Sequence, residues 1–255
     1  MVSKNDYTIR AVDRALGVLD LFIEKGDSLT LKEISEYSNQ PMPTVLRLLR
    51  TLQNRGYVYV DEDTKKYSLG YHIYMLGIHV KQIEEIHRLC IPFMEKLMNK
   101  IGLVCHVAIL NGDKVIIIEK LFPENKPRYE LQSRVGLTVP VHCTSVGKVL
   151  ISEMSDDRIK SLYADKLDRF TDNTITDIDE LITVIHRVRQ QGFASTHNEH
   201  ESFVRCVAYP VFNSQQKIVC AISVTGIDRE LEGDQLDLCH KLLRSTAREL
   251  SGLFK

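Results

Sequence analysis

The stretch that decides the N-terminal fold is "NQPMPTVLRLLRTLQNRGYV", from Asn39 to Val58. Four of its apolar residues recur at the spacing of one helix face, namely Val45, Leu48, Leu49 and Leu52. The opposite arc is polar and carries Pro43, Thr44, Arg47, Arg50, Thr51 and Asn54. The sequence therefore predicts an amphipathic helix, and the first question is what its arginine-bearing face does.

Both ends of this helix are marked. Proline is tolerated only in the first turn, where a backbone N–H has no intrahelical partner, so Pro43 lies close to the start. Gly56 ends the helix, since glycine adopts the conformation that commonly follows a last turn. Residues 39–60 include three arginines and no acid, whereas residues 20–38 include five acids and two bases. Positive charge is therefore concentrated on this helix.

Two further helices are predicted before it. The segment 9–23 has apolar residues at helical spacing, which we expect to form one stripe: Val12, Ala15, Leu16, Leu19 and Phe22 or Ile23. Thr30 is followed three residues later by Glu33, a pattern that forms a capping box. A second short helix is therefore predicted from Leu31 to Tyr37.

A β-hairpin is predicted after it. Two strand-like segments, 57–60 and 67–69, flank the polar sequence "DEDTKK", which places Lys65 and Lys66 at the turn. Three short helices and a hairpin within about 60 residues are typical of a winged helix-turn-helix. The basic helix and the two lysines predict attraction to DNA phosphates and contact with bases in a groove. The alternative is a solvated helix surface without a partner.

The composition limits the class of protein. The net charge of the 255 residues is −1, so any contact with nucleic acid must be local. No apolar run approaches the roughly 20 residues of a membrane span, and the first residues lack the apolar core of a signal peptide. We expect a cytoplasmic protein. The six cysteines form no C-x-x-C pair, which favours buried thiols in a reducing compartment over disulfides.

The rest of the chain alternates between helical and strand-like segments. One long amphipathic connector helix is predicted over 70–89, and Pro92 is expected to open another. Strands are predicted at 103–110, 114–121, 128–136, 193–199, 204–212 and 217–227, and helices at 147–154, 156–167, 177–192 and 232–253. This predicts an α+β fold with a largely antiparallel sheet. We expect domains at 1–70 and 91–255, joined by a connector at 71–90.

Six segments carry a resemblance to a known family: "RAVDRALGVLDLF", "TVLRLLRTLQNRGYV", "KYSLG", "PVHCTSVGKVLIS", "EHESFVRCVAYPVF" and "AISVTG". Over nearly its whole length the chain resembles the IclR family of bacterial transcriptional regulators. The resemblance implies an N-terminal winged helix that binds operator DNA as a dimer. It also implies a C-terminal, GAF-like effector domain that holds a small molecule, often an organic acid.

The helix face and the resemblance together give the residues expected to contact DNA: Thr30, Pro43, Thr44, Arg47, Arg50, Thr51, Asn54, Lys65 and Lys66. The chain departs from the family pattern at two places. A Lys-Ser-Thr-like helix entry is replaced by Met42-Pro43-Thr44, which removes a hydroxyl and an N–H that could contact a phosphate. The usual glycine before "VRCVA" is replaced by Phe203, which we expect to fill or reshape the edge of the pocket.

The sequence "TSVGKVL" suggests an anion site. A tight polar turn leads into a helix predicted to start near Gly147, so the N–H groups of Ser145 and Val146 can face an anion. The resemblance implies that these amides take the carboxylate of an effector. The alternative is simple capping by Thr144 or Ser145. A phosphate-binding loop is excluded, because Lys148 is followed by Val149.

Ser223 and Thr225 alternate with apolar residues in a predicted strand, so both hydroxyls point to one face and need partners there. The resemblance places effector contacts at these two positions and at Thr196 and Cys206. An acid is frequent at the Thr196 position, so threonine implies a different effector. Leu131 and Val139 would form an apolar wall. Glu199 either orients the loop or is a solvated acid.

The leading hypothesis is a ligand-responsive repressor of a catabolic operon, with no cofactor, no metal and no enzymatic activity. Its partners are operator DNA, a small carboxylate such as a sugar acid or 2-oxo acid, and a second copy in a dimer that can pair into a tetramer.

A metal or thiol sensor is the alternative, using His106, His142, Cys105, Cys143 and Cys206. The adjacent pairs among these residues would point to opposite faces of a strand. An enzyme with Cys143 or Cys206 as nucleophile and His142 as base is less favoured, since no acid is evidently placed to orient the histidine.

Overall fold

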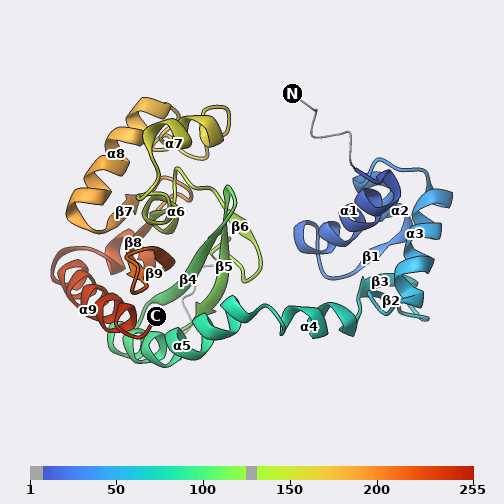
Figure 1. Ribbon diagram of the computed structural model, residues 1–255, viewed down its shortest axis with the longest axis horizontal. Helices are drawn as coiled ribbons and strands as arrows, with labels where there is room; N and C mark the ends of the chain where they lie inside the picture. Colours follow the sequence, from blue (N-terminus) through green and yellow to red (C-terminus); the bar gives the residue numbers. More distant parts are fainter. Residues whose placement is uncertain (1–7, 125–130) are drawn as a thin grey trace. The chain divides into compact units, whose positions relative to one another are not determined.

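The computed structural model describes residues 8–124 and 131–255. The chain divides into two compact units, Met1–Glu84 and Glu85–Lys255, which are described separately (Figure 1). The elements of the first unit are α1 (Arg10–Glu24), β1 (Leu29–Thr30), α2 (Leu31–Tyr37), α3 (Met42–Asn54), β2 (Val58–Val60), β3 (Lys66–Leu69) and α4 (Tyr71–Gly77). The three strands form an antiparallel sheet in the order β1-β3-β2. This is a helix-turn-helix with a small sheet, as predicted.

The first unit has its own core, to which α1, α2, α3 and the sheet contribute Val18, Leu21, Phe22, Leu29, Ile34, Val45, Leu49 and Val58. The predicted stripe of α1 was only partly right: Phe22 is buried and Leu19 packs against the core, but other members are exposed. Side chains of Val12 and Leu16 are 52% and 55% exposed, and Val18 and Leu21 are buried instead. Because α1 has apolar residues on two arcs, spacing alone could not show which arc faces the core.

The predicted start of α2 and the predicted end of α3 are both present in the structure. The Thr30 hydroxyl accepts the N–H of Glu33 at 3.2 Å, and the Glu33 carboxylate accepts the N–H of Thr30 at 2.7 Å. The capping box is therefore confirmed, and α2 spans the predicted residues. Gly56, at φ +74°, follows the end of α3. The three-residue strand β2 begins two residues later.

The connector differs from the prediction. Instead of one helix over 70–89, α4 ends at Gly77 and α5 (Lys81–Ile101) begins after a short break. Pro92 lies inside α5 rather than opening a helix. Proline removes the N–H that would bond to the carbonyl of Arg88. Buried residues on both sides of it, Cys90 and Met94, hold the helix in place, so tertiary packing overrides the proline signal.

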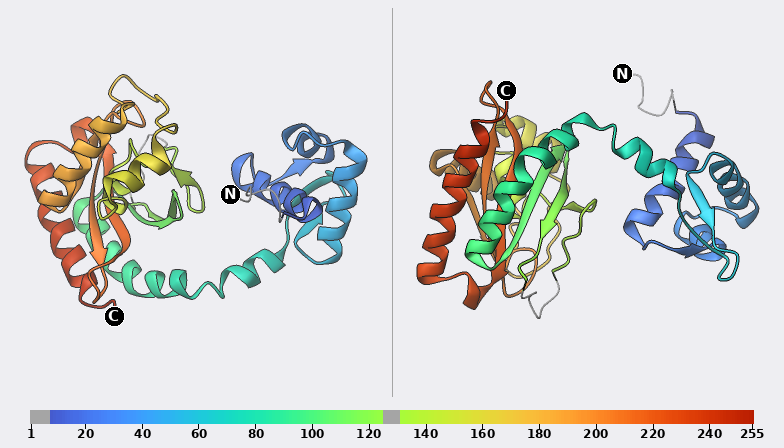
Figure 2. Two further views of the ribbon diagram at one scale, coloured as in Figure 1. Left: turned by 45° about the horizontal axis from the view of Figure 1, so that its top comes forward. Right: turned by 90° about the horizontal axis from the view of Figure 1, so that it is seen from below.

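The second unit is an antiparallel sheet covered on both faces. Its remaining elements are β4 (Val104–Asn111), β5 (Lys114–Leu121), β6 (Thr138–Val139), α6 (Ser145–Leu150), α7 (Asp156–Tyr163), α8 (Ile178–Gln191), β7 (Ala194–His197), β8 (Val204–Phe212), β9 (Ile218–Ile227), η1 (Asp228–Glu230) and α9 (Gly233–Ser251). The strand order is β6-β5-β4-β9-β8-β7. Helices α5 and α9 lie on one face and α6 lies on the other, with α8 against α6 and α7 against α8 (Figure 2).

The predicted α+β class is correct, but one predicted strand is not formed as expected. Of the segment 128–136, residues 128–130 lie outside the described residues, and residues 131–136 form no strand. They contain a bend and a turn, and side chains of the sheet contact them: Lys120 donates to the carbonyls of Leu131 and Ser133, and His106 lies beside the Ser133 hydroxyl. The other predicted strands and helices are present, with ends that differ by a few residues. In the described ranges, no helix is long and apolar enough to span a membrane.

Candidate functional sites

The first candidate site is the outer face of α3. Arg47, Arg50, Thr51 and Asn54 are exposed on it, as is Pro43 in the first turn. Thr44 is half-buried. The Thr51 hydroxyl donates to the carbonyl of Arg47 at 2.9 Å, so the helix already uses it. No acidic side chain of the described residues forms an ion pair with Arg47 or Arg50, which leaves both guanidinium groups available to an anionic partner.

Thr30 and one of the two hairpin lysines, unlike the arginine side chains of α3, already have partners among the described residues. The hydroxyl of Thr30 serves the capping box and also donates to the Glu33 carboxylate at 2.8 Å. Lys65 lies in the turn at φ +55° and pairs with Glu62 at 2.9 Å. Lys66 is not in the turn: it is the first residue of β3 and is exposed. The wing therefore presents one lysine with an acidic neighbour and one on a strand.

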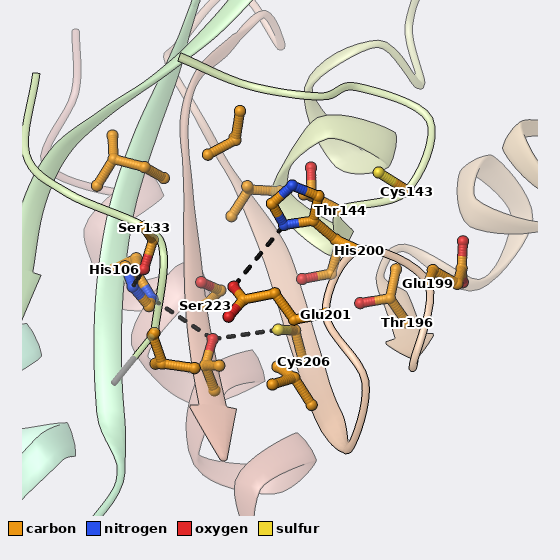
Figure 3. A pocket seen from close by; sticks show the side chains of 17 residues that line it. His106, Ser133, Cys143, Thr144, Thr196, Glu199, His200, Glu201, Cys206 and Ser223 are labelled. Carbon is orange, nitrogen blue, oxygen red and sulfur yellow. Dashed lines mark hydrogen bonds and ion pairs between the residues drawn. The ribbon is translucent and has the colours of Figure 1, made fainter. Parts of the chain in front are cut away.

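The second candidate site is a pocket in the second unit, on the face of the sheet that carries α6 (Figure 3). It contains about 530 Å³ of unoccupied space, including the part open to solvent. All of the predicted effector residues line it: Leu131, Val139, Ser145, Val146, Thr196, Cys206, Ser223 and Thr225. Their roles in binding stay predictions, but the fold brings together residues that are up to 94 positions apart in the chain.

One wall of the pocket is the N-terminus of α6, which begins at Ser145 rather than near Gly147. The Thr144 hydroxyl accepts the N–H of Gly147 at 3.2 Å and donates to the carbonyl of Pro140 at 2.6 Å. A Cβ on Gly147 would lie 2.4 Å from the carbonyl oxygen of Val141, so the close approach of this turn requires glycine. Capping by Thr144 thus leaves two N–H groups available to an anion, since no acceptor among the described residues takes the N–H of Ser145 or Val146.

The opposite wall carries hydroxyl groups and a histidine. Ser223 and Thr225 of β9 are both buried. The Thr225 hydroxyl donates to the sulfur of Cys206 at 3.2 Å and lies 3.4 Å from Nδ1 of His106. Nε2 of His106 lies 2.9 Å from the Ser133 hydroxyl. Burial, with a smaller contribution from the Lys120 cation, lowers the pKa of His106 to about 3, so its imidazole is neutral at physiological pH.

The loop between β7 and β8 forms the remaining side. Glu199 is held by an ion pair in which its carboxylate accepts from Lys148 at 2.5 Å, and the Lys148 side chain is only 1% exposed. The Thr174 hydroxyl also donates to the carbonyl of Glu199 at 2.6 Å. Burial raises the pKa of Glu199, and the Lys148 ammonium acts in the opposite direction. Glu199 therefore orients this loop, and the alternative of a solvated acid is wrong.

Four polar residues that line the pocket were not predicted from the sequence to lie there: His106, Ser133, His200 and Glu201. His106 was considered only as a metal ligand. Its place beside Ser223 depends on the register between β4 and β9, which no local pattern encodes. Ser133 reaches the pocket because Lys120 donates to its carbonyl at 2.6 Å. This contact joins a strand to a segment without regular secondary structure, so no residue pattern predicts it.

Phe203 does not fill the pocket edge as expected. Its side chain is 71% exposed, and it is not among the residues that line the pocket. Its φ is +65°, a left-handed conformation that glycine adopts without strain and that costs other residues free energy. The backbone at this position therefore explains why glycine is usual there. Phenylalanine keeps the same backbone and points outward.

The arrangement does not favour a thiol or metal centre. Burial raises the pKa of Cys143 to about 12 and that of Cys206 to about 11, so both are protonated thiols, which are poor nucleophiles and ligands. Nε2 of His142 lies 2.9 Å from the carbonyl of Asp168 rather than from a carboxylate. Across residues 8–124 and 131–255, no three histidine, cysteine or acidic side chains are grouped as metal ligands.

A helix-turn-helix with a basic outer helix and a second unit with a small-molecule pocket define a ligand-responsive DNA-binding regulator. Comparison with known proteins agrees. Residues 11–62 match the family model "IclR helix-turn-helix domain", and residues 79–252 match "Bacterial transcriptional regulator IclR C-terminal". The chain belongs to the IclR family, whose members are transcriptional regulators and not enzymes.

Relatives match over nearly the whole chain. The transcriptional regulator XynR of Escherichia coli K12 is 31% identical over 244 residues, covering 95% of this chain and 96% of the relative. The repressor AllR of the same strain is 27% identical, covering 95% and 89%. An IclR regulator structure from Alicyclobacillus acidocaldarius has a TM-score of 0.83 at 27% identity, covering 96% and 99%. An IclR homologue from Microbacterium hydrocarbonoxydans, complexed with 4-hydroxybenzoate, has a TM-score of 0.84 at 19% identity, covering 95% and 98%.

Proposed function

We propose that this protein is a cytoplasmic repressor of a catabolic operon and that a small organic acid in the second unit's pocket controls its binding to DNA. Residues 1–70 would form the DNA-binding domain and residues 91–255 the effector-binding domain. The observation that carries the proposal is the pocket itself, which is lined by two residues whose N–H groups have no acceptor among the described residues and by buried hydroxyls. The similar AllR is named a repressor, and one similar structure holds a carboxylate, which supports the same class of effector.

The pocket suits one carboxylate. Backbone N–H groups at a helix start carry partial positive charge and can each donate to a carboxylate oxygen. Ser145 and Val146 supply two such groups side by side, and the Ser223 hydroxyl, which has no partner among the described residues, is available for the remainder of the ligand. The acid would bind without a lysine or arginine of the described lining.

The DNA contacts would come from α3 and the wing. Arg47 and Arg50 are placed to donate to base edges in a major groove, since they project from the exposed arc of the second helix of the motif. Pro43, Thr44, Thr51 and Asn54 would lie along the same surface. Lys65 and Lys66 would contact phosphates, and Thr30 would support the surface by capping α2.

The regulator would act as a dimer. The first unit exposes apolar side chains on α1 and α4: Val12, Leu16, Ile23, Tyr71, Tyr74, Met75 and Leu76. An exposed apolar surface of this extent indicates an interface. We assign it to a second copy, because two winged helices on two half-sites roughly add their binding free energies. Pairs of dimers would form a tetramer.

The test is a two-stage binding experiment. The full-length protein first selects DNA from a random-sequence pool, and the enriched sequence is then labelled and titrated by fluorescence anisotropy. Organic acids are added next. The proposal expects a pseudo-palindromic sequence to be enriched and at least one carboxylate to shift the DNA affinity. It fails if no sequence is enriched, or if no acid binds the protein at millimolar concentration.

A further inference from the structure

The charges that line the effector pocket are unevenly distributed. Among the described lining residues, the charged or titratable groups other than the thiols are Glu199, Glu201, His106 and His200, and none is a lysine or arginine. The charge of Glu199 is balanced by Lys148 at 2.5 Å. The Glu201 carboxylate lies 3.8 Å from Nδ1 of His200, and burial lowers the pKa of His200, which favours the neutral imidazole. Glu201 is therefore a lining carboxylate with no lysine or arginine in the described lining itself. Burial raises the pKa of Glu201, and the Lys120 cation, which donates to the carbonyls of Leu131 and Ser133, acts in the opposite direction.

Glu201 is placed to contact a ligand. It lies in the loop before β8, and its side chain extends into the pocket with its carboxylate facing the ring of His200 (Figure 3). Its side chain is 15% exposed. One carboxylate oxygen accepts the N–H of Gln132 at 3.2 Å. A carboxylate has about four acceptor positions, so Glu201 keeps acceptor capacity for donors of a ligand.

The neighbouring side chains favour the same chemistry. Hydroxyls of Ser133, Thr196, Ser223 and Thr225 line the same pocket as Glu201. Hydroxyl groups both donate and accept, which matches a ligand that carries hydroxyls of its own. The described lining contains no phenylalanine or tyrosine, so it lacks the side chains on which an aromatic acid usually stacks.

We propose that Glu201 is a specificity-determining residue that selects hydroxylated aliphatic monocarboxylates and rejects dicarboxylates. This rests on the proposed function, in which the pocket binds an acid through the Ser145 and Val146 amides. Glu201 then accepts hydrogen bonds from hydroxyls at the far end of the ligand. A second ligand carboxylate at that end meets the Glu201 carboxylate, and two like charges in a partly desolvated pocket repel each other. A simple 2-oxo acid offers Glu201 no donor.

Matched ligands test this directly. Aldonates of four to six carbons carry one carboxylate and a terminal hydroxymethyl group. Aldarates of the same length replace that group with a second carboxylate, and straight-chain alkanoates lack all the hydroxyls. Isothermal titration calorimetry of the full-length protein would measure all three series. We expect at least one aldonate to bind about tenfold or more tighter than its aldarate and its alkanoate, as expected for hydrogen bonds to a charged group.

Three variants identify the residue. Glu201→Gln keeps the size and an acceptor for the Gln132 N–H but removes the charge, so the preference for aldonate over aldarate should fall about tenfold. Glu201→Asp keeps the charge and should still reject aldarates. Glu153→Gln, an exposed change outside the pocket, is the charge-matched control and should behave as the wild type. Melting curves and DNA binding would show that each variant is folded.

The possible failures are distinguishable. If the wild type binds an aldarate or alkanoate as tightly as the matched aldonate, the role of Glu201 is wrong while the carboxylate pocket stands. The same holds if Glu201→Gln weakens every acid equally and leaves the aldonate-to-aldarate ratio unchanged, since that indicates only a structural role. If no acid of the three series binds, both the effector class and the role of Glu201 are overturned.

Discussion

Single side chains of α3 are where sequence recognition would occur. Arg47 and Arg50 project from the exposed arc without an acidic partner in the described chain, whereas Lys65 of the wing pairs with Glu62. An arginine that donates two hydrogen bonds to a guanine edge reads sequence, whereas a lysine near a phosphate adds only a sequence-independent attraction. The two kinds of residue therefore predict different behaviour on mutation.

Replacing Arg47 or Arg50 with alanine should weaken operator binding by about 1–3 kcal/mol for at least one of them and relax specificity at one base pair. Lys66→Ala should weaken binding to every sequence and reduce the salt dependence. Lys65→Ala should have a smaller effect, because Glu62 offsets its charge. Anisotropy titrations against the operator and its single-base variants would measure this. Unchanged affinity in both arginine variants would rule out α3 as the recognition helix.

The hydroxyls of β9 should matter for the effector and not for the fold. Changing Ser223 to Ala and Thr225 to Val together should weaken a bound carboxylate at least about tenfold, since each hydrogen bond to a charged ligand is worth roughly 1.5–3 kcal/mol. Ser223→Ala alone is the cleaner change, because Thr225 also contacts Cys206 and His106. Thermal-shift titration measures the effect. A carboxylate that stabilises both proteins equally binds somewhere else.

His106 should make stability depend on pH. Burial lowers its pKa from 6.5 to about 3, so the folded protein holds the neutral form and the unfolded chain binds the extra proton. This contribution is present above the unfolded pKa and is lost as pH falls towards 3. Between pH 7 and pH 5 it amounts to about 2 kcal/mol. His106→Gln should therefore lose less stability than the wild type over that interval in urea titrations. Equal losses would show that His106 is not buried as a neutral group.

At the scale of elements, the turn into α6 links backbone geometry to ligand binding. Gly147 lies so close to Val141 that no side chain fits, and this contact sets where the Ser145 and Val146 amides point. The helix itself has only six residues, so its position depends on packing more than on its own hydrogen bonds. A change at Gly147 should therefore affect both stability and the effector.

Gly147→Ala places a Cβ 2.4 Å from the carbonyl oxygen of Val141 and 2.6 Å from its Cα, which are backbone atoms that cannot rotate away. We expect a loss of about 1–3 kcal/mol or more in stability, together with weaker effector binding. Gly17→Ala in α1 is the control, since nothing lies within 4 Å of its Cβ position. It should stabilise the protein by roughly 0.5–1 kcal/mol. Similar effects of both changes on the melting temperature would contradict the close approach.

The sequence predicted elements well where the signal was local. The capping box of Thr30 and Glu33 and the glycine after α3 depend on neighbouring residues, and both formed as expected. The errors arose where distant contacts decide. Pro92 stays inside α5 because that helix has buried residues on both sides of it, from Ile86 to Ile101. The segment 131–136 forms no strand, and Lys120 instead holds its backbone against the pocket.

In the candidate site, too, some residues could be predicted from the sequence, whereas others depend on contacts between distant segments. The eight predicted effector positions came from the family resemblance together with the strand alternation of Ser223 and Thr225, and they converge on one pocket. His106 and Glu201 were missed because their places depend on strand register and loop geometry. Neither property is expressed in the residue pattern of a short segment. The role of Phe203 was misjudged because its backbone conformation, rather than its size, determines where the ring points.

For the whole molecule, the proposed dimer is the property on which operator binding should depend. The apolar residues exposed on α1 and α4 lie in the first unit, whereas the effector pocket lies in the second. An interface so close to the DNA-binding helices would fix the spacing between two recognition helices, which must match half-sites about one helical turn apart. Dimerisation should therefore be separable from effector binding by mutation.

Leu16→Glu puts a charge on the exposed apolar face of α1, where the side chain is 55% exposed, so the unit should stay folded while the dimer dissociates. We expect a monomer in analytical ultracentrifugation, a large loss of operator affinity and unchanged effector binding. Leu253→Glu, at an exposed leucine of the second unit, is the control and should leave the dimer intact. A Leu16→Glu protein that remains a dimer would exclude α1 from the interface.

The anion contacts proposed at α6 have a consequence for how this protein changes over generations. The N–H groups of Ser145 and Val146 belong to the main chain, so no ordinary codon change deletes them. The side chains that would choose the rest of the ligand, such as Thr196, Glu201 and Ser223, can be exchanged one at a time. The protein from a duplicated gene could thus respond to a new acid after a few substitutions, while the backbone hydrogen bonds to the carboxylate stay unchanged. The same separation offers protein engineers a route to retargeted biosensors.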